Sequence, residues 1–187
     1  LLGEGRRTFE IAIIALPMTY IIITGGIDLS VGAILGMSAV VMGFAWQDWG
    51  VPLPLAIGLC LLTGTIAGFI NGFFIMRFKL PPLIMTLATL ALYRGVAEGI
   101  SQGGQARGFP AWFTDLGRAE YGGVPLHVWI ILVSVIISAL ALSRTTFGRG
   151  LYAMGNNELA ARFAGIPVNR LKLIIYTFSG FMAGLAG

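Results

Sequence analysis

Long apolar runs alternate with short polar segments along this chain. A helix needs about 20 apolar residues to cross a bilayer, and four runs have the length and character of such helices. They are Leu53–Met76, Leu80–Gln102, Val124–Leu142 and the run that starts at Leu171. The pattern predicts an all-α fold, a polytopic bundle of transmembrane helices.

The beginning of the chain predicts two more apolar helices, joined at a break. Across residues 11–47 the only charged residue is Asp28. One helix over this stretch would be roughly 55 Å long, whereas the hydrocarbon core is about 30 Å thick. Gly25 and Gly26 supply the break. It leaves two arms of about 25–29 Å, and so about six apolar segments in all; the arms are Ile11–Ile27 and Leu29–Gln47.

Asp28 has two interpretations at this stage. It falls at or near a membrane edge between the two arms, where Asp28 or Ser30 caps the second helix. Alternatively, the break at Gly25 and Gly26 exposes backbone groups to a polar cavity, as broken helices do in transporters. Both interpretations place these residues at a helix terminus.

Small and polar residues inside the third run indicate a helix contact. Gly64, Gly68 and Gly72 recur at intervals of four, and such a stripe lets a neighbouring helix approach closely. Asn71 lies beside the stripe. Its amide either forms a hydrogen bond across the contact or faces a central path.

The run Leu80–Gln102 carries charges and hydroxyls. Arg94 and Glu98 are four residues apart, so we expect them to form an ion pair near the outer mouth. Thr86 and Thr89 lie deeper, where their hydroxyls either bond to their own helix or line a pathway.

The longest polar interruption is Ser143–Lys172, which holds five basic residues and one acid, Glu158. Asn156 and Asn157 are favourable helix N-caps, and Glu158 then lies at the positive end of the helix that follows.

The same segment contains signals for the end of that helix. Gly165 suits a left-handed cap, and Pro167 prevents the helix from resuming. We expect a helix of about two turns, Glu158–Ala164, with Leu159 and Phe163 on one face. It is either a connector that lies on its own bundle or a stiff docking element for a soluble partner.

Composition supports an integral membrane protein. Hydrophobic residues make up 57% of the chain and charged residues 11%, with a mean hydropathy of +0.87, well outside the globular range. The net charge of +4 is better explained by topology than by nucleic-acid binding. Cys60 is the only cysteine, which excludes an internal disulfide and a cysteine-based metal site.

We expect a single transmembrane domain over residues 1–187, with Ser143–Lys172 as a loop within it. The start at Leu1 rather than Met, and the end inside an apolar run, suggest a fragment that lacks spans on the C-terminal side and one on the N-terminal side. No cleavable signal peptide is visible.

The distribution of basic residues predicts an orientation. If Ser143–Lys172 is inside, the loop 77–79 and Asp28 are inside as well, and the turn 47–49 and the loop 103–123 are outside. These boundaries agree with the positive-inside tendency. The aromatic residues of the outer loop suit a membrane interface, and we assign His127 to that interface too.

Arg6 and Arg7 disagree with this orientation, because they lie outside if the first arm spans fully. Either that arm is re-entrant, or these residues sit at the outer headgroups.

No catalytic set is visible. The chain lacks a GxxxxGK[ST] phosphate loop, HExxH, GxSxG and paired carboxylates deep in the membrane. Nor does it have the series of buried acids or histidines typical of a proton-coupled carrier, although Asp28 alone remains a candidate. Any energy must therefore come from another subunit.

Three blocks carry a resemblance to a known family. They are TGGIDLSVGAILGMSAVV (Thr24–Val41), FKLPPLIMTLATLALYRG (Phe78–Gly95) and GRGLYAMGNNELAARFAGIPVNRLK (Gly148–Lys172). In this order they resemble the membrane permease of bacterial ABC sugar importers, the ribose, rhamnose and autoinducer-2 branch. The resemblance covers nearly the whole chain, and the stretch FPAWFTDLGRAE…GGVPL leans towards the rhamnose or autoinducer-2 type.

The resemblance implies a multi-pass permease of the bacterial inner membrane. It forms the path for a monosaccharide or sugar-like molecule and pairs with a second copy or a sister permease. Two cytoplasmic ATPases, which bind ATP and Mg²⁺, and a periplasmic sugar-binding protein complete the assembly. The permease itself is a transporter subunit rather than an enzyme, with no cofactor, metal or nucleic acid of its own.

The resemblance also assigns residues. Those expected to couple to the ATPase are Gly155, Asn156, Asn157, Glu158, Ala161, Arg162, Phe163 and Gly165. The translocation-path candidates are Gly25, Gly26, Asp28 and Ser30, to which the residue analysis adds Asn71 and Thr86. Trp112 and Asp115 are expected to face the binding protein.

Two other classes of function stay open. In one, the protein is an ion-coupled secondary carrier or channel for a small polar solute, with Asp28 binding the coupling ion. In the other, it is a scaffold subunit that stabilises a partner without forming the path.

Overall fold

The protein is described by a computed structural model over residues 2–117 and 119–187, with side chains from Phe9 onward. Its elements in chain order are α1 (Leu2–Ile23), α2 (Val31–Gln47), α3 (Leu53–Phe78), α4 (Pro82–Ser101), α5 (Ala111–Leu116), β1 (Glu120–Tyr121), β2 (Val124–Pro125), α6 (Leu126–Arg144), α7 (Thr146–Asn156), α8 (Glu158–Phe163) and α9 (Val168–Ala186).

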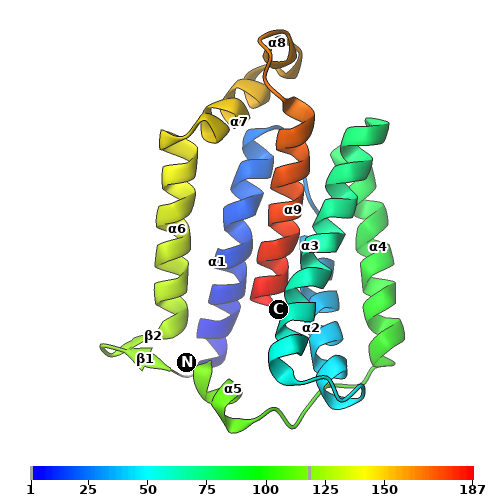
Figure 1. Ribbon diagram of the computed structural model, residues 1–187, viewed down its shortest axis with the longest axis vertical. Helices are drawn as coiled ribbons and strands as arrows, with labels where there is room; N and C mark the ends of the chain where they lie inside the picture. Colours follow the sequence, from blue (N-terminus) through cyan, green and yellow to red (C-terminus); the bar gives the residue numbers. More distant parts are fainter. Residues whose placement is uncertain (1, 118) are drawn as a thin grey trace.

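The long helices run side by side along one axis, and the short elements cap the two ends of the bundle (Figure 1). α7 and α8 lie at one end, which we call the α8 end, with α8 at its tip. α5 and the β1–β2 hairpin lie at the opposite end, which we call the α5 end. The all-α prediction is confirmed, with a small hairpin as an addition at the end of the predicted outer loop. Its second strand takes the first two residues of the predicted run Val124–Leu142.

Hydropathy agrees with a membrane bundle. Within the described residues, α3, α4 and α6 are each long and apolar enough to cross a membrane, and shorter apolar helices cover Phe9–Ile23 and Val31–Gln47. α1 is one continuous helix that runs from the α5 end to the α8 end (Figure 1), which favours the alternative in which the first arm spans fully. The side chains of Arg6 and Arg7 lie outside the described residues.

The centre of the bundle is the contact between α3 and α9, where glycines of the two helices face each other. A Cβ at Gly64 would overlap the backbone of Gly180, and a Cβ at Gly68 would overlap the backbone of Tyr176 and Gly180. The predicted stripe of small residues therefore does allow close helix approach, because no side chain separates the two backbones. Next to this contact, the Cys60 thiol lies 3.2 Å from the carbonyl oxygen of Gly184.

α7 is an element that the sequence analysis did not predict. Its N-cap, Thr145, accepts a hydrogen bond from the amide of Gly148. Leu151 and Met154 are buried on its inner face, while Arg149 and Tyr152 are exposed. The polar interruption therefore holds two helices in succession, and α8 projects beyond the first.

Candidate functional site

α8 is a short helix fixed at both termini by local sequence. The Asn157 side chain accepts a hydrogen bond from the amide of Ala160 at 3.0 Å and caps the helix, as predicted. Asn156, the other N-cap candidate, is instead the last residue of α7. The predicted helix Glu158–Ala164 is one residue shorter, because Ala164 is its C-cap.

Gly165 ends α8 as its sequence indicates. Its φ is +79°, a conformation that favours glycine. The Gly165 amide donates to the carbonyl of Arg162, and the Ile166 amide donates to that of Ala161. This pair of bonds is a Schellman motif, which turns the chain sharply back towards α9.

Charged side chains tie α8 to α9. Glu158 accepts hydrogen bonds from Lys172 at 2.7 Å and from Arg162 at 2.8 Å. Arg162 also donates to Asn169 at 2.9 Å. Burial raises the pKa of the Glu158 carboxyl, but the bonds from Lys172 and Arg162 outweigh it and hold that pKa below its usual value. α8 is therefore attached to α9 as one unit.

The outer face of α8 is apolar and uncovered. Leu159 is 63% exposed and Phe163 is 84% exposed, whereas Ala161 on the inner side is buried. Among the expected coupling residues, Gly155 and Asn156 end α7 and the others lie in α8 or at its caps. The structure thus brings this whole set together at the tip of the α8 end (Figure 1).

The break after α1 is a second Schellman motif. The Gly25 amide donates to the carbonyl of Ile22, and the Gly26 amide donates to that of Ile21, both at 2.9 Å. Gly25 has a φ of +74°, which requires glycine for the same reason as at the end of α8. The sequence correctly placed the break, and the unwound chain continues to Ser30, the N-cap of α2.

A buried polar cluster holds this unwound segment. Its members are Asp28, Ser30, Asn71, Tyr93 and Ser179, which come from the α1–α2 connection, α3, α4 and α9. The Asp28 carboxylate accepts bonds from the Ser30 hydroxyl at 2.6 Å, the Ser30 amide at 3.0 Å and the Ser179 hydroxyl at 3.2 Å. The Asn71 amide donates to the Ser30 hydroxyl at 2.7 Å and accepts from Tyr93 at 3.3 Å.

Asp28 lies deeper than the sequence analysis expected. Only 2% of its surface is exposed. Asn71, to which it is linked through Ser30, is seven residues from the end of α3, or about 10 Å along the helix. Asp28 therefore lies inside the bundle and not at its surface, because the turn at Gly25 sends the chain back into the bundle before α2 starts.

The proposed capping role of the Ser30 side chain is also corrected. Ser30 occupies the N-cap position of α2, but its side chain makes no capping bond. Its hydroxyl is instead held by Asp28 and Asn71. Asn71 bonds to Ser30 of the α1–α2 connection and to Tyr93 of α4, and not across the contact of α3 with α9.

Threonines and tyrosines complete the surroundings of the break. Thr86 bonds mainly to its own helix, through the carbonyl of Pro82 at 2.9 Å, and also lies 3.4 Å from the carbonyl oxygen of Ile27. Thr89 bonds within α4. Tyr176 packs over Gly26, where a Cβ would meet its hydroxyl at 2.9 Å. Thr86, Thr89, Tyr93 and Tyr176 are all buried.

Tyr93, Tyr176 and Ser179 were not among the residues predicted from the sequence. The available signal was helical spacing: Thr86, Thr89 and Tyr93 lie on one face of α4, and Tyr176 and Ser179 on one face of α9. That spacing shows a polar face but not which helix the face contacts.

The remaining predicted residues lie at the α5 end. Trp112 and Asp115 are exposed on α5, and the Trp112 ring packs edge-on against Phe113. Arg94 and Glu98 form the expected ion pair at 3.1 Å, with both side chains exposed. The ring of His127 packs against Phe9. In the described part of the chain, no group of three or more His, Cys, Asp or Glu residues is placed to hold a metal ion.

Comparison with known proteins identifies the family. Over residues 6–187 the chain matches the family described as branched-chain amino acid transport system, permease component. It is 38% identical over 182 residues to the autoinducer 2 import system permease protein LsrD of Escherichia coli strain K12, and the same holds for LsrD of Shigella flexneri and of Escherichia coli O157:H7. No solved structure matches it.

The matches cover 94% of this chain and 55% of each relative, so the chain spans about half the length of the curated relatives it matches. The likeness confirms the resemblance to import permeases that the three sequence blocks indicated. Because the family match extends over nearly the whole chain, this protein belongs to the family of permease components of branched-chain amino acid transport systems.

Proposed function

We propose that the chain is part of a permease subunit of an ATP-binding cassette importer in the bacterial inner membrane. Its substrate is a sugar-like molecule of the autoinducer-2, rhamnose or ribose type, and the similarity to LsrD favours the first. A periplasmic binding protein delivers the substrate, and cytoplasmic ATPases bind ATP and Mg²⁺. A second copy or a sister permease completes the path, and this subunit performs no catalysis itself.

The observation that carries the proposal is the exposed apolar face of α8. A helix of six residues has little stability alone, yet this one is capped at both ends and bonded to α9. Such fixation costs conformational entropy and still leaves Phe163 84% exposed. A rigid apolar surface at the tip of the bundle suits a soluble ATPase that grips it and moves it.

The same contacts offer a route from α8 to the broken helix. Lys172 and Asn169 join α8 to the first turns of α9. Further along α9, Ser179 donates to Asp28. We infer that movement of α8 is passed along α9 to the polar cluster around Asp28 and changes the packing there. Nucleotide binding then favours one of two arrangements of the path, as alternating access requires.

A charge reversal at Glu158 and a charge in place of Phe163 test the proposal. In the assembled importer, Glu158→Lys combined with Phe163→Asp should abolish ATP-dependent uptake and the copurification of the ATPase, while membrane insertion is unchanged. Glu158→Lys breaks the bonds to Lys172 and Arg162, and Phe163→Asp removes the largest exposed apolar contact.

The matched control is Trp112→Asp combined with Asp115→Lys on α5. This pair should lower delivery by the binding protein but leave copurification of the ATPase intact. Uptake and ATPase binding that survive the α8 changes would contradict the coupling role. Uptake that persists without ATP and collapses with an ion gradient would instead favour a secondary carrier.

A further inference from the structure

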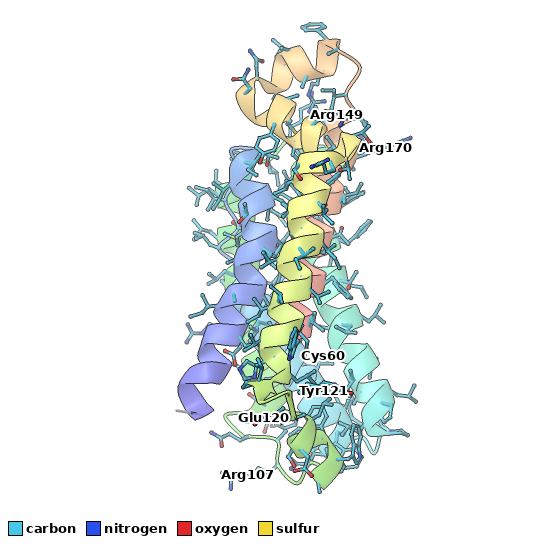
Figure 2. All side chains as sticks on the ribbon, turned by 90° about the vertical axis from the view of Figure 1, so that its left-hand side faces the viewer. Cys60, Arg107, Glu120, Tyr121, Arg149 and Arg170 are labelled. Carbon is cyan, nitrogen blue, oxygen red and sulfur yellow. The ribbon has the colours of Figure 1, made fainter. Side chains whose placement is uncertain are left out.

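Several arginines at the α8 end are exposed and form no ion pair with any described residue, among them Arg149 on α7 and Arg170 near the start of α9. The one acid of the segment, Glu158, is bound to Lys172 and Arg162. α7 and α9 touch next to the two arginines, since a Cβ on Gly150 would lie 3.0 Å from the side chain of Leu171. Figure 2 shows both arginines at this end and Arg107 at the other.

The protein surface beside these arginines is hollowed and largely apolar. A cavity of about 600 Å³ lies between α7 and the loop that leads into α9, and its lining includes Phe147, Ile166 and Leu171, with Arg149 as its one charged residue. A second hollow of about 340 Å³ shares Ile166 and Pro167 with the first. Its lining also includes Asn169, Arg170 and Arg162, the last of which is bound to Glu158. Two cationic groups thus flank an apolar hollow, an arrangement that suits an amphiphile with an anionic head.

The level of this site along the bundle distinguishes a lipid from a soluble partner. The apolar helix α6 ends at Arg144, and α9 begins at Val168, so Arg149 and Arg170 lie where the spans end. The exposed side of α7 also carries Tyr152, three residues after Arg149, and tyrosine is typical of the headgroup layer. α8 projects beyond this level (Figure 1), which leaves a partner on α8 further from the membrane.

We propose that Arg149 and Arg170 bind the phosphate of an anionic phospholipid of the cytoplasmic leaflet, and that the apolar hollow beside them takes the adjoining part of its acyl chains. The inference rests on the proposed orientation, with the α8 end towards the cytoplasm. Basic pockets between helices on that side are a recurrent mode of anionic lipid binding, and the guanidinium group forms two parallel bonds to a phosphate.

The test uses the whole permease, purified without its ATPase and titrated with dioleoylphosphatidylglycerol, dioleoylphosphatidylcholine or inorganic phosphate. Native mass spectrometry counts bound lipid. Arg149→Gln and Arg170→Gln should each weaken phosphatidylglycerol binding about five-fold, the effect of one basic residue near a membrane surface. Arg107→Gln, at the opposite end, is the matched control and should leave binding unchanged. Arg149→Lys keeps the charge, so its phosphatidylglycerol binding should fall less than that of Arg149→Gln. This comparison distinguishes a loss of charge from a folding defect.

Equal binding of the two lipids, or an equal loss in the Arg107 variant, would overturn the proposal. Tight binding of inorganic phosphate that displaces the lipid would show a soluble anion site instead. Unchanged lipid binding, together with less ATPase in a separate purification of the whole importer, would overturn the proposal and assign the arginines to the ATPase contact. Because lipid binding is measured without the ATPase, a failure of the coupling role of α8 leaves this result unaffected.

Discussion

At the scale of single residues, the most unusual feature is a buried carboxylate whose partners are hydroxyls and amides. Asp28 forms no ion pair with any described residue, and its bonds come from Ser30 and Ser179. A buried polar group is costly when it loses a partner. Asn71 is therefore an informative position, because its amide joins Ser30 to Tyr93 and so links three segments of the bundle.

Asn71→Ala should destabilise the protein by about 1–3 kcal/mol, since it removes two buried hydrogen bonds, one to the Ser30 hydroxyl and one from the Tyr93 hydroxyl. Thermal unfolding in detergent measures the change. Thr65→Ala is the control on the same helix, because the Thr65 hydroxyl bonds only to the carbonyl of Leu61 in its own turn. Equal losses in the two variants would argue against a cluster that holds the broken helix.

The carboxyl of Glu158 predicts a pH dependence. Its pKa is lowered in the folded protein, so the bonds to Lys172 and Arg162 stabilise the fold above the usual glutamate pKa of about 4.3 and are lost as the pH falls below it. The difference in melting temperature between the wild type and Glu158→Gln should shrink between pH 7 and pH 3.5. A difference that stays constant over this range would contradict the assigned ion pairs.

The residues themselves show what could be predicted. Gly25, Gly165 and Asn157 act through their nearest neighbours in the chain, and the sequence correctly assigned all three. The buried position of Asp28 could not be predicted in this way, because it depends on contacts with α3 and α9, which are distant in sequence. Nothing in the local pattern indicates that Ser179 donates a hydrogen bond to it.

At the scale of elements, the contrast is between α8 and α7. α8 was predicted from its caps, whereas α7 was missed because Gly148, Gly150 and Gly155 weaken its helical signal. Those glycines are explained by packing: at Gly148 a Cβ would overlap the backbone of Leu142, and at Gly155 that of Ile23. Tertiary contact thus overrides a poor local propensity.

The contact between α3 and α9 provides a direct test at this scale. Gly68→Ala should destabilise the protein by about 1–3 kcal/mol, because the new methyl group would overlap the backbone of Tyr176 and Gly180. Gly58→Ala on the same helix is the control. A Cβ at Gly58 would have no atom of a neighbouring element within 4 Å among the described residues. Alanine there should therefore raise stability slightly. Melting temperatures that fall equally in both variants would contradict the close approach of the helices.

At the scale of the whole molecule, the grouping of elements at two ends was predictable and the pairing of helices was not. The basic residues of the loop 77–79 and of Ser143–Lys172 predicted that these two segments lie on the same side of the membrane. The structure places both segments at the α8 end (Figure 1). The glycine stripe of α3 packs against α9, a helix that is distant from it in the sequence. Both helices carry small residues at intervals of four, but periodicity alone does not show which stripes meet.

The orientation of the whole bundle can be tested with its cysteine content. Cys60 is the only cysteine in the sequence and its thiol is buried, so it gives little background labelling. Leu159 and Trp112 are exposed at opposite ends of the bundle, and each accepts cysteine without loss of a core contact. In spheroplasts of a bacterial host, a membrane-impermeant maleimide should label Trp112→Cys directly and Leu159→Cys only after lysis, because basic loops favour the cytoplasm.

The reverse labelling pattern would place α8 outside the cell, where no cytoplasmic ATPase reaches it, and would contradict both the coupling role and the lipid assignment. Labelling of both cysteines before lysis would show a permeable membrane and is recognised by a cytoplasmic marker protein that becomes labelled too. With the expected pattern, adding the ATPase to lysed membranes should slow labelling of Leu159→Cys and leave Trp112→Cys unchanged. That difference follows only if the partner covers the apolar face of α8, so one pair of variants tests both the orientation and the docking surface.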